Sequence, residues 1–211
     1  MMRFSTLLRH PADWMTGART EPGAVVTSRI RLARNLRGHA FPGWAKKAER
    51  LETLGILRTA VEELPAMKDA FSRELVDLSS VQKQVLVERH LISREHAARS
   101  EGSGAVIERR QSFSIMLNEE DHLRMQSIRP GLQLKEAYEA LNALDSELEQ
   151  QLEYAFDPTL GYLTTCPTNL GTGLRASAML HLPGLVLSDQ IGPVLQAVNK
   201  IGLAVRGLYG E

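Results

Sequence analysis

The sequence has only one cysteine, Cys166, among its 211 residues, and only 5% of its residues are aromatic. A single cysteine excludes an internal disulfide framework and is typical of a reducing compartment, so we expect a cytoplasmic protein. No apolar run approaches the length of a membrane span, and Arg9 and His10 interrupt the first apolar residues before they reach the length of a signal-peptide core. The sequence therefore predicts no membrane partner.

Excess charge of either sign is also absent, because Lys and Arg total 25 and Asp and Glu total 25. A balanced chain lacks the positive field that draws proteins onto nucleic acid, so we expect no nucleic-acid partner. The six histidines and one cysteine show no zinc-ligand spacing, and we expect no protein-bound metal. No Gly-Lys-Ser/Thr phosphate loop and no His-Arg-Asp catalytic loop occur, which excludes the two common kinase plans.

The hydrophobic pattern alternates between the periods of strands and helices. Period-2 runs and apolar residues at three- and four-residue spacing indicate one α+β domain without linkers or repeats. The expected strands cover 25–32, 75–78, 105–108, 113–117, 161–166 and 203–206. The expected helices cover 46–64, 134–152, 174–182 and 187–201, with a further helical turn capped by Ser79 and Ser80. The runs at 105–108 and 113–117 form a hairpin, so we predict an antiparallel sheet flanked by helices.

Three consecutive carboxylates follow the strand expected at 113–117. They are Glu119, Glu120 and Asp121, between Asn118 and His122. Carboxylates match the fork of a guanidinium bidentately, and one held close to it can also accept its proton. The cluster therefore predicts a site that grips a guanidinium. His122 is a ligand, an acid–base group or a partner of these acids.

Five arginines stand at the ends of expected strands or turns, or on an expected strand: Arg29, Arg31, Arg124, Arg175 and Arg206. The usual role of a single arginine is a solvated surface charge. Five in such positions suit a clamp for a polyphosphate, whose transferring group spreads charge over several oxygens.

Around the glycine turn Gly171–Thr172–Gly173 the sequence favours a strand, a tight turn and a helix N-terminus, which together make a sound anion site. Such turns are most often only turns, so the motif alone is weak. Cys166 precedes this turn; it is either a small buried apolar residue or a group that positions a guanidinium substrate.

Four segments, taken in order, closely resemble the phosphagen (guanidino) kinase superfamily. They are the segments 28–35, 118–124, 166–177 and 205–207, and the resemblance runs from about Val25 to Glu211. Within the superfamily the sequence looks most like the bacterial branch that phosphorylates arginine residues in proteins. The resemblance implies a glutamine-synthetase-like catalytic domain at 24–211, preceded by a short extension at 1–23. The family continues past Glu211, so we expect a chain that is incomplete at its C-terminal end.

By motif position, the resemblance also implies functional residues. Glu120 looks like the catalytic base, Asp121 like its partner in orienting the guanidinium, and Cys166 like the conserved thiol of the site. ATP would contact Thr27, Ser28, Arg29, Ile30, Arg31, His90, Arg124, Arg175, Ala176, Ser177, Ala178, Met179, Arg206, Gly207, Leu208, Tyr209, Gly210 and Glu211.

The activity implied is transfer of the ATP γ-phosphoryl group to the guanidino group of protein arginines, with Mg²⁺ held mainly by the nucleotide. Implied partners are protein substrates, a small zinc-binding activator and a repressor of stress genes, in protein quality control and the stress response. Two alternatives stay open: a kinase for free arginine or a related guanidino metabolite, and a non-catalytic ATP-binding module.

Overall fold

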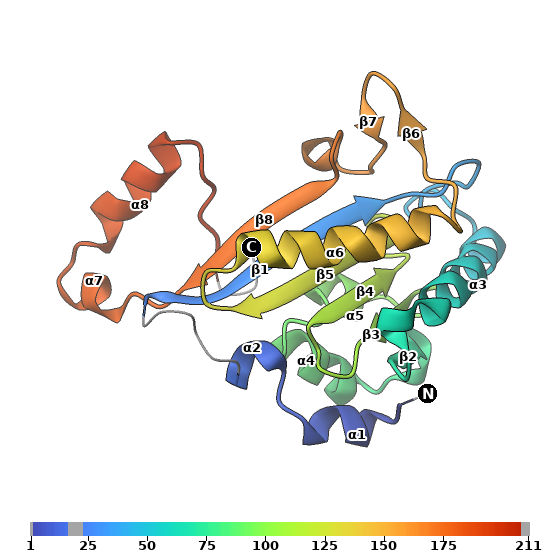
Figure 1. Cartoon of the computed structure of the whole chain (residues 1–211), viewed down its shortest axis with the longest axis horizontal. Coiled ribbons are helices and arrows are strands. Elements are labelled where there is room, and N and C mark those ends of the chain that lie inside the picture. The colour runs from blue at the N-terminus through green and yellow to red at the C-terminus, as the bar shows by residue number, and fades with distance from the viewer. Residues whose placement is uncertain (1, 17–22, 208–211) are drawn as a thin grey trace.

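The computed structural model describes residues 2–16 and 23–207. Its centre is a six-stranded antiparallel sheet in the order β2-β3-β4-β5-β1-β8. The strands are β1 (Val25–Arg34), β2 (Phe71–Glu74), β3 (Gly104–Ile107), β4 (Phe113–Leu117), β5 (Leu123–Pro130) and β8 (Leu174–Leu180). A separate two-stranded hairpin pairs β6 (Phe156–Asp157) with β7 (Gly161–Tyr162) and rises above the sheet in Figure 1. The predicted α+β class and antiparallel sheet are confirmed.

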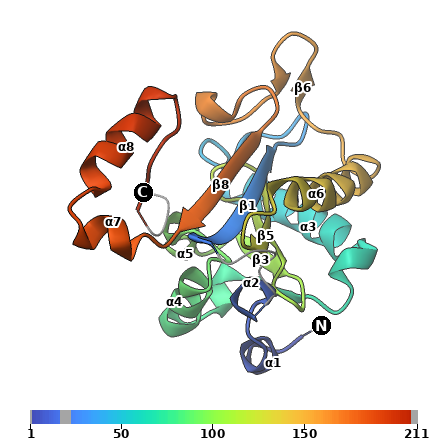
Figure 2. The same ribbon diagram turned by 60° about the vertical axis from the view of Figure 1, so that its left-hand side comes forward.

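Helices lie on both faces of the sheet (Figures 1 and 2). They are α1 (Phe4–Arg9), α2 (Asp13–Thr16), α3 (Lys47–Glu63), α4 (Ser80–Glu88), α5 (Arg94–Ala97), α6 (Leu134–Glu149), α7 (Pro183–Leu187) and α8 (Ile191–Lys200). The predicted helices at 46–64 and 134–152 correspond to α3 and α6. Ser79 caps α4 by accepting a hydrogen bond from the backbone N–H of Gln82, as the sequence predicts.

The alternation of side chains along the strands creates two apolar cores. On one face, Ile30 and Leu32 of β1 and Met125 of β5 pack with the apolar stripes of α3 and α6. On the other face, Phe71, Ile107 and other residues of β2, β3 and β4 pack with α1 and α4. The second core covers only the β2 end of the sheet, so the same face of β5, β1 and β8 is left for polar side chains.

One predicted helix is a strand in the structure. Residues 174–180 form β8, which pairs with β1 from Leu32↔Leu174 to Val25↔Leu180. Leu, Arg, Ala and Met are good helix formers, but the free edge of β1 offers a row of backbone partners that outweighs this local preference. The glycine turn therefore leads into a strand, and the predicted anion site at a helix N-terminus is wrong.

Other boundaries also differ from the expectations. The strand expected at 75–78 lies at 71–74, because Glu74 is the last residue paired with β3, and a 3-10 turn, Leu75–Asp77, follows. The strand expected at 161–166 is limited to β7. The helix expected at 187–201 is divided into α7 and α8 at Asp189, whose φ is 58°, and Pro183, which we expected to end a helix, begins α7. Residues 203–207 form no strand.

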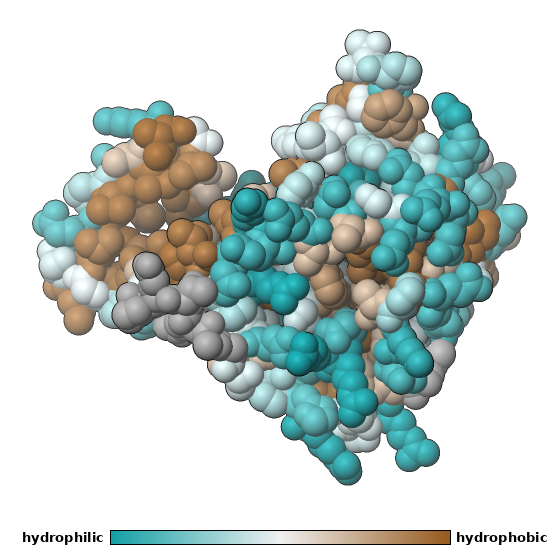
Figure 3. All heavy atoms as spheres, in the orientation of Figure 1, coloured by the Kyte–Doolittle hydropathy of each residue, from teal (hydrophilic) through white to brown (hydrophobic). Residues whose placement is uncertain are grey.

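The α7–α8 segment leaves apolar side chains exposed. Leu187 is 88% exposed and Ile201 74%, and Figure 3 shows this segment as a brown surface. None of the residues of α7 or α8 is buried. The described part of the predicted extension at 1–23, in contrast, packs against the domain, because Leu7 of α1 is fully buried in the second core.

A buried arginine joins β1 to the glycine turn. Arg34 forms an ion pair with Asp145 of α6 at 2.6 Å and lies over the ring of Tyr162 at 3.6 Å. Its Nη1 donates a hydrogen bond to the carbonyl of Thr172. Gly173 has φ +63°, and a Cβ atom at this position would lie 2.5 Å from both the Ala33 carbonyl oxygen and Arg34 Nη1.

We expect Gly173→Ala to lower the free energy of unfolding by about 2 kcal/mol or more, because both the backbone conformation and the contact with β1 oppose a side chain. The control is Gly55→Ala in α3, where an added Cβ meets nothing within 4 Å. That substitution should be neutral or stabilise by up to about 1 kcal/mol. Urea unfolding of the two variants measures both changes, and equal stabilities would contradict the packing described here.

Candidate active site

Four arginines share one face of three neighbouring strands. Arg29 and Arg31 alternate with the core residues of β1, and Arg31 lies opposite Arg175 of β8. On the other side of β1, β5 contributes Arg124 and Gln126, the latter opposite Arg31. Directly paired residues in an antiparallel sheet point to the same face, so these side chains form one surface, which we call the arginine face.

The arginine face forms the wall of a cavity of about 400 Å³. Residues from β1, β4, β5, β8, α5 and the loops beside them line it. They are Arg29, Arg31, His90, Ile92, Ser93, Glu95, Arg99, Met116, Glu119, Glu120, Arg124, Gln126 and Arg175. Four of the five predicted arginines and the predicted base Glu120 therefore face the same space.

The arginine face carries more positive charge than its surroundings neutralise. Burial, and then the charges of Arg124 and Arg175, lower the pKa of the Arg29 guanidinium. Burial, followed by Arg29 and the other arginines, lowers the pKa of Arg31 further. A lowered pKa of a base means that its protonated form is disfavoured. An anion bound in the cavity would remove this penalty.

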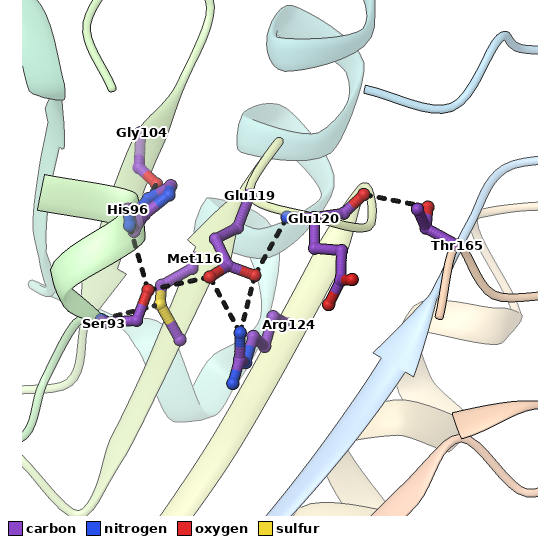
Figure 4. A network of polar contacts seen from close by, with 8 residues as sticks. All are labelled: Ser93, His96, Gly104, Met116, Glu119, Glu120, Arg124 and Thr165. Atoms are coloured by element: carbon purple, nitrogen blue, oxygen red, sulfur yellow. Dashed lines mark hydrogen bonds and ion pairs between the residues drawn. The ribbon is translucent and has the colours of Figure 1, made fainter. Parts of the chain in front are cut away.

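Among the described residues, Glu119 is the carboxylate that forms an ion pair with the arginine face. It is 2% exposed, and both of its oxygens accept from Arg124 Nη1 at 2.8 Å. Its Oε1 also accepts from the hydroxyl of Ser93 at 2.7 Å, and its Oε2 from the backbone N–H of Glu120 at 2.9 Å (Figure 4). Burial alone would raise the pKa of Glu119, but Arg124 and these hydrogen bonds lower it to about 2, so the side chain stays ionised.

The environment of the Glu120 carboxylate differs from that of Glu119. Within the described part of the chain, no hydrogen bond or ion pair engages its side chain, and Figure 4 shows the carboxylate turned away from Thr165. The backbone beside it is fixed, because Thr165 Oγ1 donates to the Glu120 carbonyl at 2.9 Å. Burial, then Asp121 and Glu119, raise its pKa. Two adjacent carboxyl groups with opposite pKa shifts are a common arrangement at acid–base sites.

The residues 118–122 form a tight turn between β4 and β5, which we call the acid loop. Asn118 has a φ of 53°, a left-handed conformation that asparagine tolerates, and its N–H bonds to the carbonyl of His122 at 2.9 Å. This turn places Glu119 and Glu120 in the lining of the cavity.

Comparison with known proteins identifies the family of this site. The family model described as ATP:guanido phosphotransferase, C-terminal catalytic domain, matches residues 54–211. The chain belongs to the ATP:guanido phosphotransferase family. The acid loop and two of the three arginine-face strands, β5 and β8, fall inside the matched residues.

Two curated relatives of this chain carry the same name. A protein-arginine kinase of Moorella thermoacetica is 46% identical over 207 residues, which are 97% of this chain and 59% of the relative. A protein-arginine kinase of Desulforamulus reducens is 47% identical over 203 residues, covering 95% of this chain and 57% of the relative. The chain thus spans less than two thirds of the length of these relatives.

Solved structures confirm the guanidino kinase fold. The duplicated taurocyamine kinase from Schistosoma mansoni, with bound transition state analog components, superposes with a TM-score of 0.80 at 25% identity. That match covers all of this chain and 30% of the other. Lombricine kinase gives a TM-score of 0.73 at 28% identity, with 96% of this chain and 60% of the other covered.

The structure places the other two predicted catalytic residues, Asp121 and Cys166, outside the cavity lining. Asp121 is 2% exposed, and its Oδ1 accepts from Asn35 Nδ2 at 2.6 Å and from the backbone N–H of Thr165 at 2.7 Å. These contacts hold the acid loop against β1 and the segment after β7. Cys166 lies in that segment with its Sγ 3.0 Å from Thr168 Oγ1. A 3-10 turn of three residues follows it, so the helix N-terminus that we expected beside the thiol is absent.

Some of the predicted ATP-binding residues line the cavity and others do not. Arg29, Arg31, His90, Arg124 and Arg175 line the cavity. Ser28, Ile30, Ala176 and Ala178 point to the opposite face of the sheet, where Ser28 bonds with the backbone of Gly131 and Gln133. Thr27, Ser177, Met179, Arg206 and Gly207 are outside the lining, although Arg206 is near enough to Arg175 to affect its electrostatics. Leu208, Tyr209, Gly210 and Glu211 lie outside the described residues.

Several lining residues had no role in the sequence prediction. Gln126 could have been found, because it follows Arg124 at the strand spacing of two. Ser93, Glu95 and Arg99 come from α5 and the residues on either side of it, and their distance of 19 residues or more from the acid loop in sequence gives no local signal. Only the packing of α5 beside β4 brings them to the cavity.

The open role of His122 is settled by its neighbours. Its Nδ1 accepts from the backbone N–H of Leu36 at 3.0 Å, and its Nε2 faces the Ala40 carbonyl at 3.1 Å. The ring is therefore neutral, with its proton on Nε2, and it joins β5 to the segment after β1 rather than pairing with the acids. Burial is the main reason why the pKa of His122 falls from 6.5 to about 4.

We expect acid to destabilise the fold partly through His122. Because its pKa is lower in the folded chain, the unfolded chain binds the proton more readily, and the stability from the neutral ring is complete above about pH 6.5 and is lost as the pH falls toward 4. His122→Gln should lower stability at pH 7.5 and flatten the decline between pH 6.5 and 4, as measured by urea unfolding at a series of pH values. An unchanged slope would contradict the neutral, buried ring.

Proposed function

We propose that this chain transfers the γ-phosphoryl group of ATP to the guanidino group of arginine residues in proteins. One observation carries the proposal: the arginine face and the free, pKa-raised carboxylate of Glu120 open into a single cavity. The curated relatives, named protein-arginine kinases, support the acceptor.

The arginine face suits the nucleotide. Planar guanidinium groups on three strands can contact several phosphate oxygens at once, and they are already in place before the reaction. The transferring phosphoryl group carries charge on three equatorial oxygens, so donors fixed on rigid strands stabilise it at little reorganisation cost. Arg29, Arg31, Arg124 and Arg175 are proposed for this role, with His90 beside them.

Magnesium fits this site as an ion carried by the nucleotide. Across residues 2–16 and 23–207 no group of three His, Cys, Asp or Glu side chains could hold a metal ion. Mg²⁺ usually binds through substrate phosphates, waters and one or two carboxylates rather than in a protein cage. Besides Glu119, the cavity lining offers the carboxylates of Glu95 and Glu120 for such a contact. When bound, the ion neutralises charge on the phosphates.

Glu120 supplies the chemistry that a guanidinium acceptor needs. An arginine side chain is protonated at neutral pH because its pKa is above about 12. As a guanidino nitrogen forms its bond to phosphorus and the bond to the bridging oxygen of ADP breaks, the proton on that nitrogen passes to the Glu120 carboxylate. A base with a raised pKa, next to the ionised Glu119, accepts it more readily than an ordinary glutamate.

Asp121 and Cys166 are proposed as residues that position this site. Asp121 fixes the backbone of the acid loop through Asn35 and Thr165, so its effect on the guanidinium is exerted through Glu120. Cys166 follows Thr165 directly and would approach the acceptor from the same segment.

The location and partners belong to the same proposal. The single cysteine favours a cytoplasmic protein. The sequence resemblance implies a role in protein quality control and the stress response, with a zinc-binding activator and a stress-gene repressor as partners. In the described residues no helix has the length and apolar character to cross a membrane.

Glu120→Gln should lower phosphoarginine formation at least about a hundredfold, because an amide cannot accept the proton. Equilibrium binding of Mg-ATP should change little, since the arginine face is untouched. In the wild-type chain the rate should fall on the acid side at a pH above the ordinary glutamate pKa of 4.5, because the Glu120 pKa is raised. Acid-labile phosphate released from the acceptor measures the rate. Activity of the variant near that of the wild type would reject the role of Glu120.

The acceptor separates the proposed kinase from its alternatives. Incubated with Mg-ATP, the chain should phosphorylate an arginine-rich unfolded protein at least about tenfold faster than free arginine at equal arginine concentration. Preference for free arginine would make it a metabolite kinase, like the taurocyamine and lombricine kinases that share its fold. Binding of ATP with no transfer to either acceptor would indicate a non-catalytic module.

A further inference from the structure

Ser93 lies where two networks meet. It is the N-cap residue of α5, and its hydroxyl oxygen accepts a hydrogen bond from the backbone N–H of His96 at 3.0 Å. The same hydroxyl donates its hydrogen to Glu119 Oε1 at 2.7 Å (Figure 4). Its own backbone N–H points to Met116 Sδ at 3.4 Å, which fixes the start of α5 against β4. The hydroxyl of Ser93 therefore links the N-terminus of α5 to the Glu119 carboxylate.

Glu119 connects Ser93 to Arg124 and to the backbone of Glu120, which line the cavity. Arg124 Nη1 bonds to both oxygens of Glu119, and the backbone N–H of Glu120 bonds to one of them. A carboxylate held by donors from α5, β5 and the acid loop has little freedom to rotate. If the donor from α5 is removed, Arg124 alone determines the position of Oε1, and both can move together toward the cavity.

The position of Arg124 matters because it is the arginine beside the acid loop. It is opposite Ala33 in β1 and Met116 in β4, next to the strand that carries Arg29 and Arg31. With Arg29 and Arg31 it therefore sets the shape of the arginine face near Glu120. A small rotation of its guanidinium would misplace a donor at the group being transferred, and misplaced donors lose most of their effect.

We propose that Ser93 is a positioning residue of the phosphotransfer site, which fixes the Glu119 carboxylate and, through it, the Arg124 guanidinium and the backbone of Glu120. The proposal rests on the function proposed above. The contact of Ser93 with Glu119 could not be predicted from a local sequence pattern, because the two residues are 26 positions apart.

Ser93→Ala removes the donor and should lower kcat for phosphoarginine formation about tenfold, the size expected for a hydrogen bond to a charged group. The Kd for Mg-ATP, measured by calorimetry, should rise several-fold because Arg124 lines the cavity. The KM for the protein acceptor should stay within about twofold. Ser93→Thr keeps a hydroxyl and a cap, and should restore most of the rate and the ATP affinity.

Ser79→Ala is the matched control. Ser79 caps α4 through the backbone N–H of Gln82, as Ser93 caps α5, but it does not line the cavity. Both alanine variants should lose thermal stability, since each loses one cap, and Ser93→Ala should lose more because it also removes the donor to the buried Glu119 carboxylate. Only Ser93→Ala should change kcat and the Kd for Mg-ATP.

Two results would overturn the role of Ser93: a Ser93→Ala chain within twofold of wild type in kcat and Kd, or losses that Ser79→Ala reproduces and Ser93→Thr does not rescue. Failure of the proposed function has a different signature, in which the wild-type chain forms no phosphoarginine. The Kd for Mg-ATP still tests Ser93 in that case, because it requires no turnover.

Discussion

The repulsion among arginines on one face of the sheet is the constraint on which the site depends. Arg29, Arg31, Arg124 and Arg175 sit on adjacent antiparallel strands, and the ladder that pairs β5, β1 and β8 prevents them from separating. Glu119 neutralises one of these charges. The remaining positive charge is held on paired strands, so the cavity is already arranged to bind a polyanion before any ligand arrives.

Strand β1 serves both the core and the site. Ile30 and Leu32 face α3 and α6, while Arg29 and Arg31 face the cavity. The hydrophobic packing on one face thus holds the charged side chains on the other. The buried contacts of Arg34 with Asp145, Tyr162 and the glycine turn extend this frame to the segment that carries Thr165 and Cys166. The acid loop is then fixed from both sides, by Asn35 and by Thr165.

Neighbouring carboxylates in the acid loop are chemically different because their surroundings differ. Glu119 is matched by Arg124, Ser93 and a backbone N–H, and it stays ionised. Glu120 is partly buried, has two negative neighbours and, among the described residues, no partner for its carboxylate, so its pKa rises. Glu119 therefore has a structural role, and Glu120 stays available for proton transfer.

The sequence determined the alternation of β1, the amphipathic stripes of α3 and α6, the hairpin of β3 and β4, and the presence of acids at a strand end, because each is a local pattern. It also carried the family motifs, and with them Glu120 and the arginines of the cavity. Tertiary structure alone decided that 174–180 is a strand, since the free edge of β1 competes with local helix preference. It alone placed Ser93 beside Glu119 and turned Asp121 toward Asn35. Contacts between residues far apart in sequence depend on how strands and helices pack, and no short window of residues contains that information.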